Sequence, residues 1–352
     1  MKEKTVSKGP STERVGAVDT MKGIAIILMV IGHIQQGAMH RRLWGVSPSV
    51  THAVHFADAC IYSFHMAVFF FVAGLFLERS VHRRGMIRFI LEKAKTILYP
   101  YVLWGILFGL LASLTTKFRV TEQPTNWQSV LIGLITGNSS WFLITLFVSQ
   151  MLSLLLFRLP FWARMAIAVG ATYVIPSTGT TVLIAPFQYL PFLIAGMWFS
   201  GDRLTMLGQV QKARAGIVFV LLLAAQLTLI YLLGPVTRWD SLPLGLNGIA
   251  MVLFLGYAIR GSRVDRILQW YGAGSLGVFL LHPIFQGAGR EFVTRVLHTT
   301  HPLPYLGITT AIAATIPVVI WNLQDRLHFS FLFHWPSKKT SVASSKAQPV
   351  AG

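Results

Sequence analysis

Three polar residues that could do chemistry interrupt the first long apolar run of the chain, residues 14–34. They are Asp19, Lys22 and His33. A separation of eleven residues places Lys22 and His33 within about 20° of the same helix face and roughly 16 Å apart along the axis. Such a polar stripe on a membrane helix costs free energy unless it faces a cavity or a protein partner. We therefore expect this helix to line a cavity. Histidine is the side chain that titrates nearest neutral pH, which suits it to take a proton from a hydroxyl.

A structural explanation competes with chemistry at each of these positions. His33 could simply end the helix at the membrane surface. Asp19 and Lys22 are three residues apart, which suits an ion pair on one helix with the lysine reaching the headgroups. The functional interpretation is an anion site, in which Lys22 attracts a phosphate and Asp19 helps to hold it.

Further candidate residues lie in later apolar runs. His65 comes near the outer end of the second run, where an intramembrane histidine needs a partner. His282 lies in the middle of a run and precedes Pro283, which leaves a backbone carbonyl one turn earlier without its donor. We expect His282 to lie inside the bundle. Its role could be a structural hydrogen bond or a contact with substrate, and the sequence favours neither. Trp141 begins another run, either as an interfacial aromatic residue or as part of the cavity wall.

The segment from 79 to 96 is the densest basic cluster of the sequence. Such a segment can orient the chain in the membrane and bind anionic lipids. It can equally provide a docking site for an anionic cofactor that carries a nucleotide 3′-phosphate and a pyrophosphate. Arg88 and Lys95 are the residues that we assign to this second role.

The elements that must position these residues are membrane helices. The chain has 352 residues, of which 54% are hydrophobic and 12% charged, with a mean hydropathy of +0.60. Soluble domains carry about 25% charged residues. The long continuous runs predict an all-α polytopic membrane protein with about ten transmembrane helices. The expected spans are 17–38, 60–78, 97–115, 140–157, 162–178, 182–199, 215–234, 243–260, 274–290 and 304–323. The short segment 127–137 reads as an interfacial or re-entrant helix.

The net charge of +18 is better explained by membrane topology than by nucleic-acid binding, because the basic residues cluster in alternate loops. With ten spans, 23 of the 30 Lys and Arg residues lie on the side of the N-terminus and 7 on the other side. The positive-inside rule then places both termini in the cytoplasm. Residues 39–59 and 116–139 are expected to be the long non-cytoplasmic loops.

Three regions are expected along the chain. Residues 1–13 form a cytoplasmic N-terminal segment, 14–330 the transmembrane domain, and 331–352 a disordered cytoplasmic tail. No small-residue cleavage site follows the first run, which favours an uncleaved span. The single cysteine excludes an intrachain disulfide, and no metal-ligand spacing or soluble catalytic motif is present.

Several of these residues fall into a pattern that resembles the membrane acyltransferase-3 family, the integral-membrane sugar O-acyltransferases. The resemblance covers roughly residues 14 to 323. Its strongest part is R-x4-D-x2-K-G-x9-H, formed by Arg14, Asp19, Lys22, Gly23 and His33. Weaker parts are FHM-x2-FFF-x-AG (64–74), the basic run that ends in Tyr99-Pro100, WFL (141–143) and LLHP (280–283). Many family members have arginine where this chain has Lys22, and proline where it has Ala67.

The resemblance implies transfer of an acyl group, acetyl or succinyl, from cytoplasmic acyl-CoA to a hydroxyl of a carbohydrate or lipid-linked glycan at the outer face of the inner membrane. Acetyl-CoA is the expected donor, without a metal and without nucleic acid. His33, Asp19 and Lys22 are then the expected catalytic residues. Lys22, Arg88 and Lys95 would bind the donor, and His65, Trp141 and His282 the acceptor. The competing hypothesis is a transporter or exporter of a lipid-linked sugar or small metabolite, in which the polar stripe lines a pathway.

Overall fold

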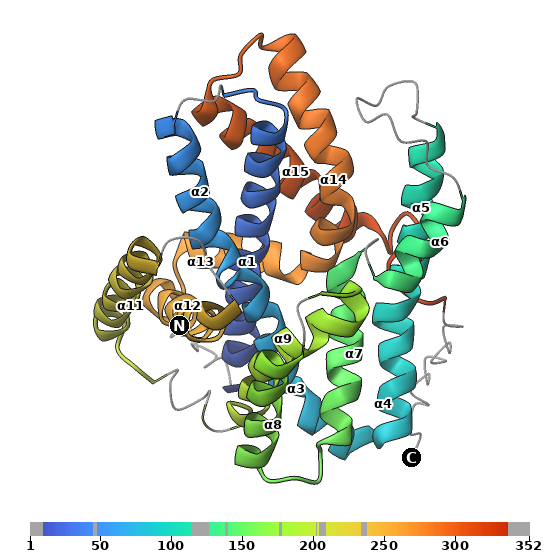
Figure 1. The fold of residues 1–352 in the computed structure, drawn as a ribbon, viewed down its shortest axis with the longest axis vertical. Coiled ribbons are helices and arrows are strands. Elements are labelled where there is room, and N and C mark those ends of the chain that lie inside the picture. The colour runs from blue at the N-terminus through green and yellow to red at the C-terminus, as the bar shows by residue number, and fades with distance from the viewer. Residues whose placement is uncertain are drawn as a thin grey trace, which may run out of the picture.

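The structure, a computed structural model, describes residues 10–44, 48–114, 127–137, 140–175, 178–201, 203, 209–233 and 238–336. In these ranges the regular structure is helical, with no strand. Figure 1 shows α1 and α3 near the middle of the molecule, α11 at its left edge, and α5 with α6 at its right edge. The longer helices are α1 (Pro10–His40), α2 (Pro48–Tyr62), α3 (His65–Arg84), α5 (Tyr99–Leu114), α6 (Trp127–Thr136), α7 (Trp141–Leu155), α8 (Phe161–Val174), α9 (Thr181–Trp198), α11 (Lys212–Leu233), α12 (Arg238–Ile259), α13 (Arg263–Ala273), α14 (Ser275–Glu291) and α15 (Pro302–Leu323).

The prediction of an all-α polytopic membrane protein is confirmed. Eight helical segments of the described residues are long and apolar enough to cross a bilayer. They are Gly16–His40, Thr51–Arg84, Met86–Leu111, Trp127–Leu155, Thr181–Trp198, Lys212–Leu233, Ser241–Ile259 and Pro302–Leu323. The other two predicted spans, 162–178 and 274–290, coincide with α8 and α14, which are shorter. The side on which the termini lie stays a prediction.

Two stretches that were expected to be loops contain helices. Most of the expected outer loop 39–59 belongs to α2, which leads through a short turn into α3. The segment between the eighth and ninth predicted spans forms α13, whose N-terminus is capped by Ser262 Oγ accepting a hydrogen bond from the Asp265 N–H at 3.1 Å. Both helices pack along α1, so tertiary packing stabilises segments that are too polar or too short to be recognised as spans.

The backbones of α3 and α9 approach each other closely in the core. A Cβ atom added to Gly74 would lie 2.0 Å from the Leu193 carbonyl oxygen, and one added to Gly196 would lie 2.0 Å from the Phe71 carbonyl oxygen. Small residues therefore let these two backbones touch, as is common between membrane helices. By contrast, α11 has a mean hydropathy of 2.5 and exposes most of its apolar side chains. Its outer face is suited to contact lipid.

The C-terminal end of the described chain belongs to the folded domain. Residues 331–336 were assigned to the tail, but Phe333 is fully buried, with its ring against those of Trp104 and Trp321. The indole N–H of Trp104 also donates to the Leu332 carbonyl at 2.7 Å. The rest of the predicted tail, 337–352, and most of the predicted N-terminal segment lie outside the described residues.

Candidate active site

The break between α2 and α3 brings Tyr62 and His65 together. The helix stops at Tyr62 and restarts at His65, and Phe64 between them has non-helical backbone angles (φ −143°). His65 Nδ1 lies 2.8 Å from the Ile61 carbonyl oxygen, one of those that the break leaves without a regular helical donor. The rings of Tyr62 and His65 meet edge to face at 4.9 Å. His65 is thus both part of the break and part of the cluster that forms there.

Two neighbouring helices hold this break in place. Gln226 of α11 donates a hydrogen bond to Ser63 Oγ at 3.0 Å, and Asn247 of α12 donates to Gln226 Oε1 at 2.6 Å. Phe64 packs directly on Gly248, where an added Cβ would lie 2.1 Å from the phenylalanine Cβ. Irregular backbone at membrane depth requires such protein partners, and the position of Tyr62 and His65 is fixed by them.

His33 joins this cluster from α1 and His282 joins it from α14. The imidazole rings of His33 and His282 are stacked, with centroids 5.2 Å apart and an interplanar angle of 23°. Tyr62 Oη lies 3.4 Å from His33 Nδ1. Three histidines that are far apart in the sequence therefore lie in one cluster, in which Tyr62 contacts His33 and His65, and His282 contacts His33.

The proline after His282 explains how this histidine is held. Pro283 has no N–H, so the Phe279 carbonyl lacks its usual helical donor. His282 Nδ1 lies 2.8 Å from that carbonyl oxygen and 3.2 Å from the Val278 carbonyl oxygen. The structural hydrogen bond that the sequence suggested for His282 is present.

These contacts determine which ring nitrogen carries the proton in two of the neutral histidines. A backbone carbonyl can only accept a hydrogen bond, so Nδ1 of His65 and Nδ1 of His282 must be protonated. Nε2 of each ring is then a free acceptor. His33 Nδ1 instead faces a hydroxyl, which can either donate or accept. Of the three histidines, His33 can therefore move its proton between Nδ1 and Nε2 without losing a hydrogen bond to a backbone carbonyl.

Trp141 belongs to an aromatic wall that continues from His282. The His282 ring is 6.3 Å from Phe279, which is 5.1 Å from Phe142, which is in turn 6.4 Å from Trp141. Trp141 also packs against Tyr189 at 5.7 Å. It is therefore linked to the histidine cluster through two phenylalanines and is not in direct ring contact with it.

The inner end of the α1 stripe is separate from the histidines. Lys22 Nζ and Asp19 Oδ1 form an ion pair at 2.7 Å, and both side chains are partly exposed. Next to them, Thr20 Oγ1 donates to the buried Asp265 Oδ1 at 2.5 Å, and the Gly261 N–H donates to Asp265 Oδ2 at 2.7 Å. The ion pair expected from the spacing of Asp19 and Lys22 is therefore present. It lies beside the hydrogen bond that joins α1 to α13.

Arg88 and Lys95 lie on a different part of the fold. Arg88 is exposed on α4 (Met86–Lys93), and Lys95 is exposed on the π-helical turn η1 (Ala94–Leu98) that follows it. This segment packs against α3 and α7, whereas α1 packs mainly against α13, α3 and α15. Neither side chain forms an ion pair with another described residue.

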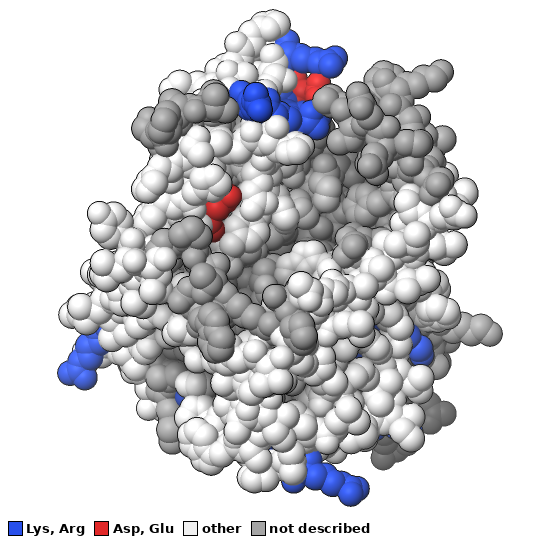
Figure 2. Space-filling model, viewed as in Figure 1, with Lys and Arg blue, Asp and Glu red and all other residues white. Residues whose placement is uncertain are grey.

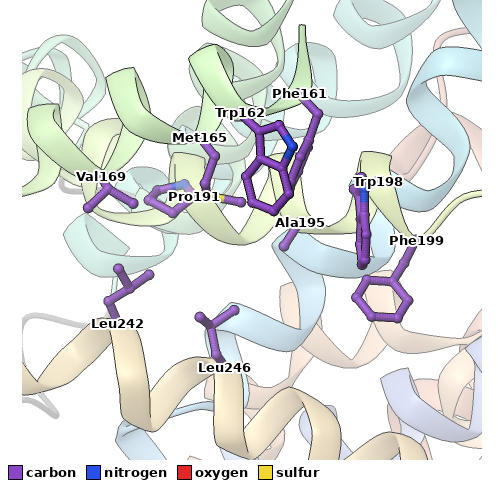
Figure 3. Close-up of a pocket in the computed structure, with 10 residues that line it drawn as sticks. All are labelled: Phe161, Trp162, Met165, Val169, Pro191, Ala195, Trp198, Phe199, Leu242 and Leu246. Atoms are coloured by element: carbon purple, nitrogen blue, oxygen red, sulfur yellow. The ribbon is translucent and has the colours of Figure 1, made fainter.

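A separate apolar pocket of about 340 Å³ lies between α8, α9 and α12, and Figure 3 shows the aromatic and aliphatic side chains that line it. None of the predicted site residues is among them. Within the described part of the chain, no group of three or more His, Cys, Asp or Glu side chains is arranged to hold a metal ion.

Sequence reasoning missed two members of the site. Tyr62 was assigned to the start of a span and given no role. Gln286 of α14 donates a hydrogen bond to the His33 carbonyl at 3.0 Å. It follows His282 by four residues, so it lies on the same helix face. The stripe argument that found Lys22 and His33 would have found Gln286 if it had been applied to residues 274–290.

Comparison with known proteins agrees with this architecture. A family model described as "Acyltransferase domain" matches residues 15–322. The nodulation protein NolL of Mesorhizobium japonicum is 23% identical over 330 residues, which cover 92% of this chain and 80% of that protein. The nodulation protein NolL of Sinorhizobium fredii is 27% identical over 190 residues, which cover 52% of this chain and 48% of that protein. No solved structure matches.

Proposed function

Since this chain belongs to the acyltransferase domain family and is a multi-pass membrane O-acyltransferase, we propose that it moves an acetyl group from cytoplasmic acetyl-CoA to a hydroxyl of a carbohydrate or lipid-linked glycan at the outer face of the inner membrane. The observation that supports this proposal most is the cluster of His33, Tyr62, His65 and His282. Four side chains from three separate segments meet there. The family match gives the reaction class, and the cluster supports our proposal that the reaction takes place there.

In the proposed reaction, His33 is the general base. When its Nδ1 proton is donated to Tyr62 Oη, its Nε2 carries the free lone pair that a base needs. Nε2 takes the proton of the acceptor hydroxyl while that oxygen attacks the thioester carbonyl of the donor. The C–S bond then breaks, and the departing CoA thiolate takes the proton from the histidinium. The products are the ester and free CoA, and His33 returns to its neutral form.

His65 and His282 have a different proposed role. Because the Nδ1 atoms of both rings bond to backbone carbonyls, the Nε2 atoms can accept hydrogen bonds from sugar hydroxyls. They would orient the acceptor, with Trp141 further along the wall. Placing two reactants in line is itself a large part of the catalysis of a group transfer.

The donor would enter from the other end of α1. Lys22, paired with Asp19, lies roughly 16 Å from His33 along the helix, a distance that a pantetheine arm can bridge. We propose that Lys22, Arg88 and Lys95 contact the phosphates of the CoA moiety. The ion pair with Asp19 positions the ammonium group of Lys22 and leaves two of its three protons available to a phosphate.

The test is acyl transfer by a His33→Ala variant. Surface glycans from cells with and without the gene are compared by mass spectrometry, and release of free CoA by the purified protein is measured with acetyl-CoA and with succinyl-CoA. Loss of a general base should lower the transfer rate by about 10²–10⁴-fold. The matched control is His52→Ala, an exposed histidine on α2. A His33→Ala variant that is well expressed and transfers acetyl at the rate of the unmodified protein would overturn the assignment.

A further inference from the structure

α1 and α14 run in parallel. On their facing sides, three residues of α1 at four-residue intervals each lie beside the corresponding residue of α14. His33 stacks on His282, and the Gln286 amide donates to the His33 carbonyl. An added Cβ at Gly37 would lie 3.1 Å from the same Gln286 amide nitrogen. One further turn outward, Arg41 and Arg290 occupy the corresponding positions. The polar seam therefore begins at the histidines and ends at two arginines.

Both elements end in conformations that gather basic side chains at this point. α1 closes with Leu43 N–H bonded to the Ala38 carbonyl and Arg42 N–H bonded to the Met39 carbonyl, and Arg42 has a left-handed φ of 54°. This is the geometry of a Schellman cap. α14 continues into the π-helical turn η3 (Phe292–Val296), which carries Arg295. π-Helical turns are rare and are often found at functional sites.

The charges in this arginine cluster, Arg41, Arg290 and Arg295, are not balanced. Arg290 bonds to Glu291 Oε1 through Nη2 at 2.7 Å and Nε at 3.1 Å, and Arg295 Nε bonds to Glu291 Oε2 at 2.7 Å. The hydrogen bond from Arg290, together with the charges of Arg290, Arg295 and Arg41, lowers the pKa of Glu291 against an opposing desolvation effect. Three guanidinium groups and one carboxylate give the cluster a net charge of +2. Figure 2 shows basic and acidic side chains gathered at the top of the molecule, toward which α14 runs in Figure 1.

The location of the cluster is unusual for basic residues. Of the seven Lys and Arg residues that the predicted topology places outside the cytoplasm, three form this cluster, namely Arg41, Arg290 and Arg295. Non-cytoplasmic segments are generally poor in Lys and Arg. The carbonyl ends of the two helices favour nearby cations. This effect alone does not account for a group of several arginines on the side that carries the histidine cluster.

We propose that the arginine cluster binds an anionic group, a carboxylate or a phosphate, of the acceptor glycan. This inference rests on the proposed function and narrows its substrate class to acidic acceptors. Arg41 and Arg290 follow His33 and His282 by eight residues, which is about 12 Å along each helix. A short oligosaccharide spans this distance. An anion held by the arginines would therefore place a hydroxyl of a neighbouring sugar at the histidines.

A partly exposed tryptophan near the cluster is suited to a sugar ligand. Trp44 follows Arg41 by three residues, and its ring packs edge to face on the buried ring of Tyr305 with centroids 5.8 Å apart. A sugar ring can stack on an aromatic face, while its acidic group pairs with guanidinium groups in a bidentate manner. Lys22, the cation assigned to the donor, lies at the opposite end of α1.

The test compares two sugars that differ in one charge. Binding of methyl glucuronide and methyl glucoside to the purified full-length protein in phosphatidylcholine nanodiscs is measured by saturation-transfer difference NMR. The unmodified protein should bind the glucuronide about five- to tenfold more tightly, which corresponds to one charge-assisted pair. The preference should shrink at about 0.5 M salt. The R41Q/R295Q double variant should bind both sugars equally, and Glu291→Gln should increase the preference. The control, Arg158→Gln, removes an exposed charge elsewhere and should leave the preference intact.

Two outcomes would overturn the proposal. One is equal binding of the two sugars by the unmodified protein, and the other is a preference that survives in the double variant. Nanodiscs that contain phosphatidylglycerol separate the two sources of anion: complete loss of the glucuronide preference in them would assign the cluster to lipid headgroups. Acetyl-CoA binding and transfer are measured in the same samples. Their absence would refute the acyltransferase proposal whatever the sugar preference is.

Discussion

Replacing Gly23 by alanine tests how closely α1 and α13 must approach. A Cβ at this position would lie 2.0 Å from the Leu268 carbonyl oxygen, and one at Gly272 would lie 1.8 Å from the Asp19 carbonyl oxygen. The obstructing atoms are backbone atoms, so no side-chain rotation relieves the clash. Reaching an ordinary contact of 3.4 Å requires the helices to separate by at least 1.4 Å, the difference between 3.4 and 2.0 Å.

The expected cost follows from two opposing effects. Alanine stabilises a helix relative to glycine by about 1 kcal/mol, whereas overpacking of a tight contact costs about 1–3 kcal/mol. A backbone clash belongs at the upper end, so we expect a net loss of about 2 kcal/mol in the free energy of unfolding. The shift also displaces Asp19 and Lys22, which lie on this interface. The KM for the acyl-CoA donor should therefore rise more than the KM for the acceptor, because His33 is about 15 Å further along α1.

The assay is thermal or denaturant unfolding of the purified protein in detergent, together with steady-state kinetics for both substrates. Gly170→Ala on α8 is the matched control, because nothing lies within 4 Å of an added Cβ there. We expect the control to keep or slightly increase stability. A Gly23→Ala variant that is as stable as the Gly170→Ala variant would refute the close contact between α1 and α13. Equal changes in the two KM values would refute the link between this contact and the donor site.

Further predictions concern three other positions. Tyr62→Phe removes the hydroxyl at His33 Nδ1 and keeps the ring packing, so kcat should fall several-fold with unchanged unfolding, measured by CoA release. Asp265→Ala removes the acceptor of the Gly261 N–H and the bond from Thr20 that joins α1 to α13, and it should cost about 1–3 kcal/mol in unfolding free energy, whereas Asp265→Asn should cost less. Burial lowers the pKa of His334, although Asp325 opposes the shift. The folded state therefore favours the neutral ring, and stability present above pH about 6.5 should be lost as the pH falls below it. Unfolding of His334→Gln between pH 7.5 and 5.5 should show a smaller loss than the unmodified protein.

The helices and part of the site were predictable because each rests on a local pattern. Hydropathy located all ten segments that were expected to be spans, and the structure shows a helix in each of them. The face shared by Lys22 and His33 follows from helix geometry alone. The hydrogen bond of His282 follows from the carbonyl that Pro283 leaves without a donor. These inferences needed only residues within a few turns of one another.

The rest depends on contacts between distant segments. Nothing near Ser63 and Phe64 in the sequence marks a helix break, because there is no proline and the break is held by Gln226 and Gly248 from later helices. Tyr62 enters the site only through that break. Gly23 was noted as part of a motif with Lys22, and its packing reason becomes visible only once α13 is placed against α1.

The same irregularities explain why one histidine of the three is suited to be the base. In a regular membrane helix, each interior carbonyl already accepts a hydrogen bond from the N–H four residues later. The break before His65 and the proline after His282 each leave a carbonyl that receives the histidine Nδ1 proton. These two rings are thereby restricted to one tautomer and serve as acceptors. His33 lies in the uninterrupted part of α1, and its Nδ1 faces a hydroxyl, so it can change its protonation state during a reaction cycle. The positions of the two helix irregularities therefore support the proposal that His33 is the base.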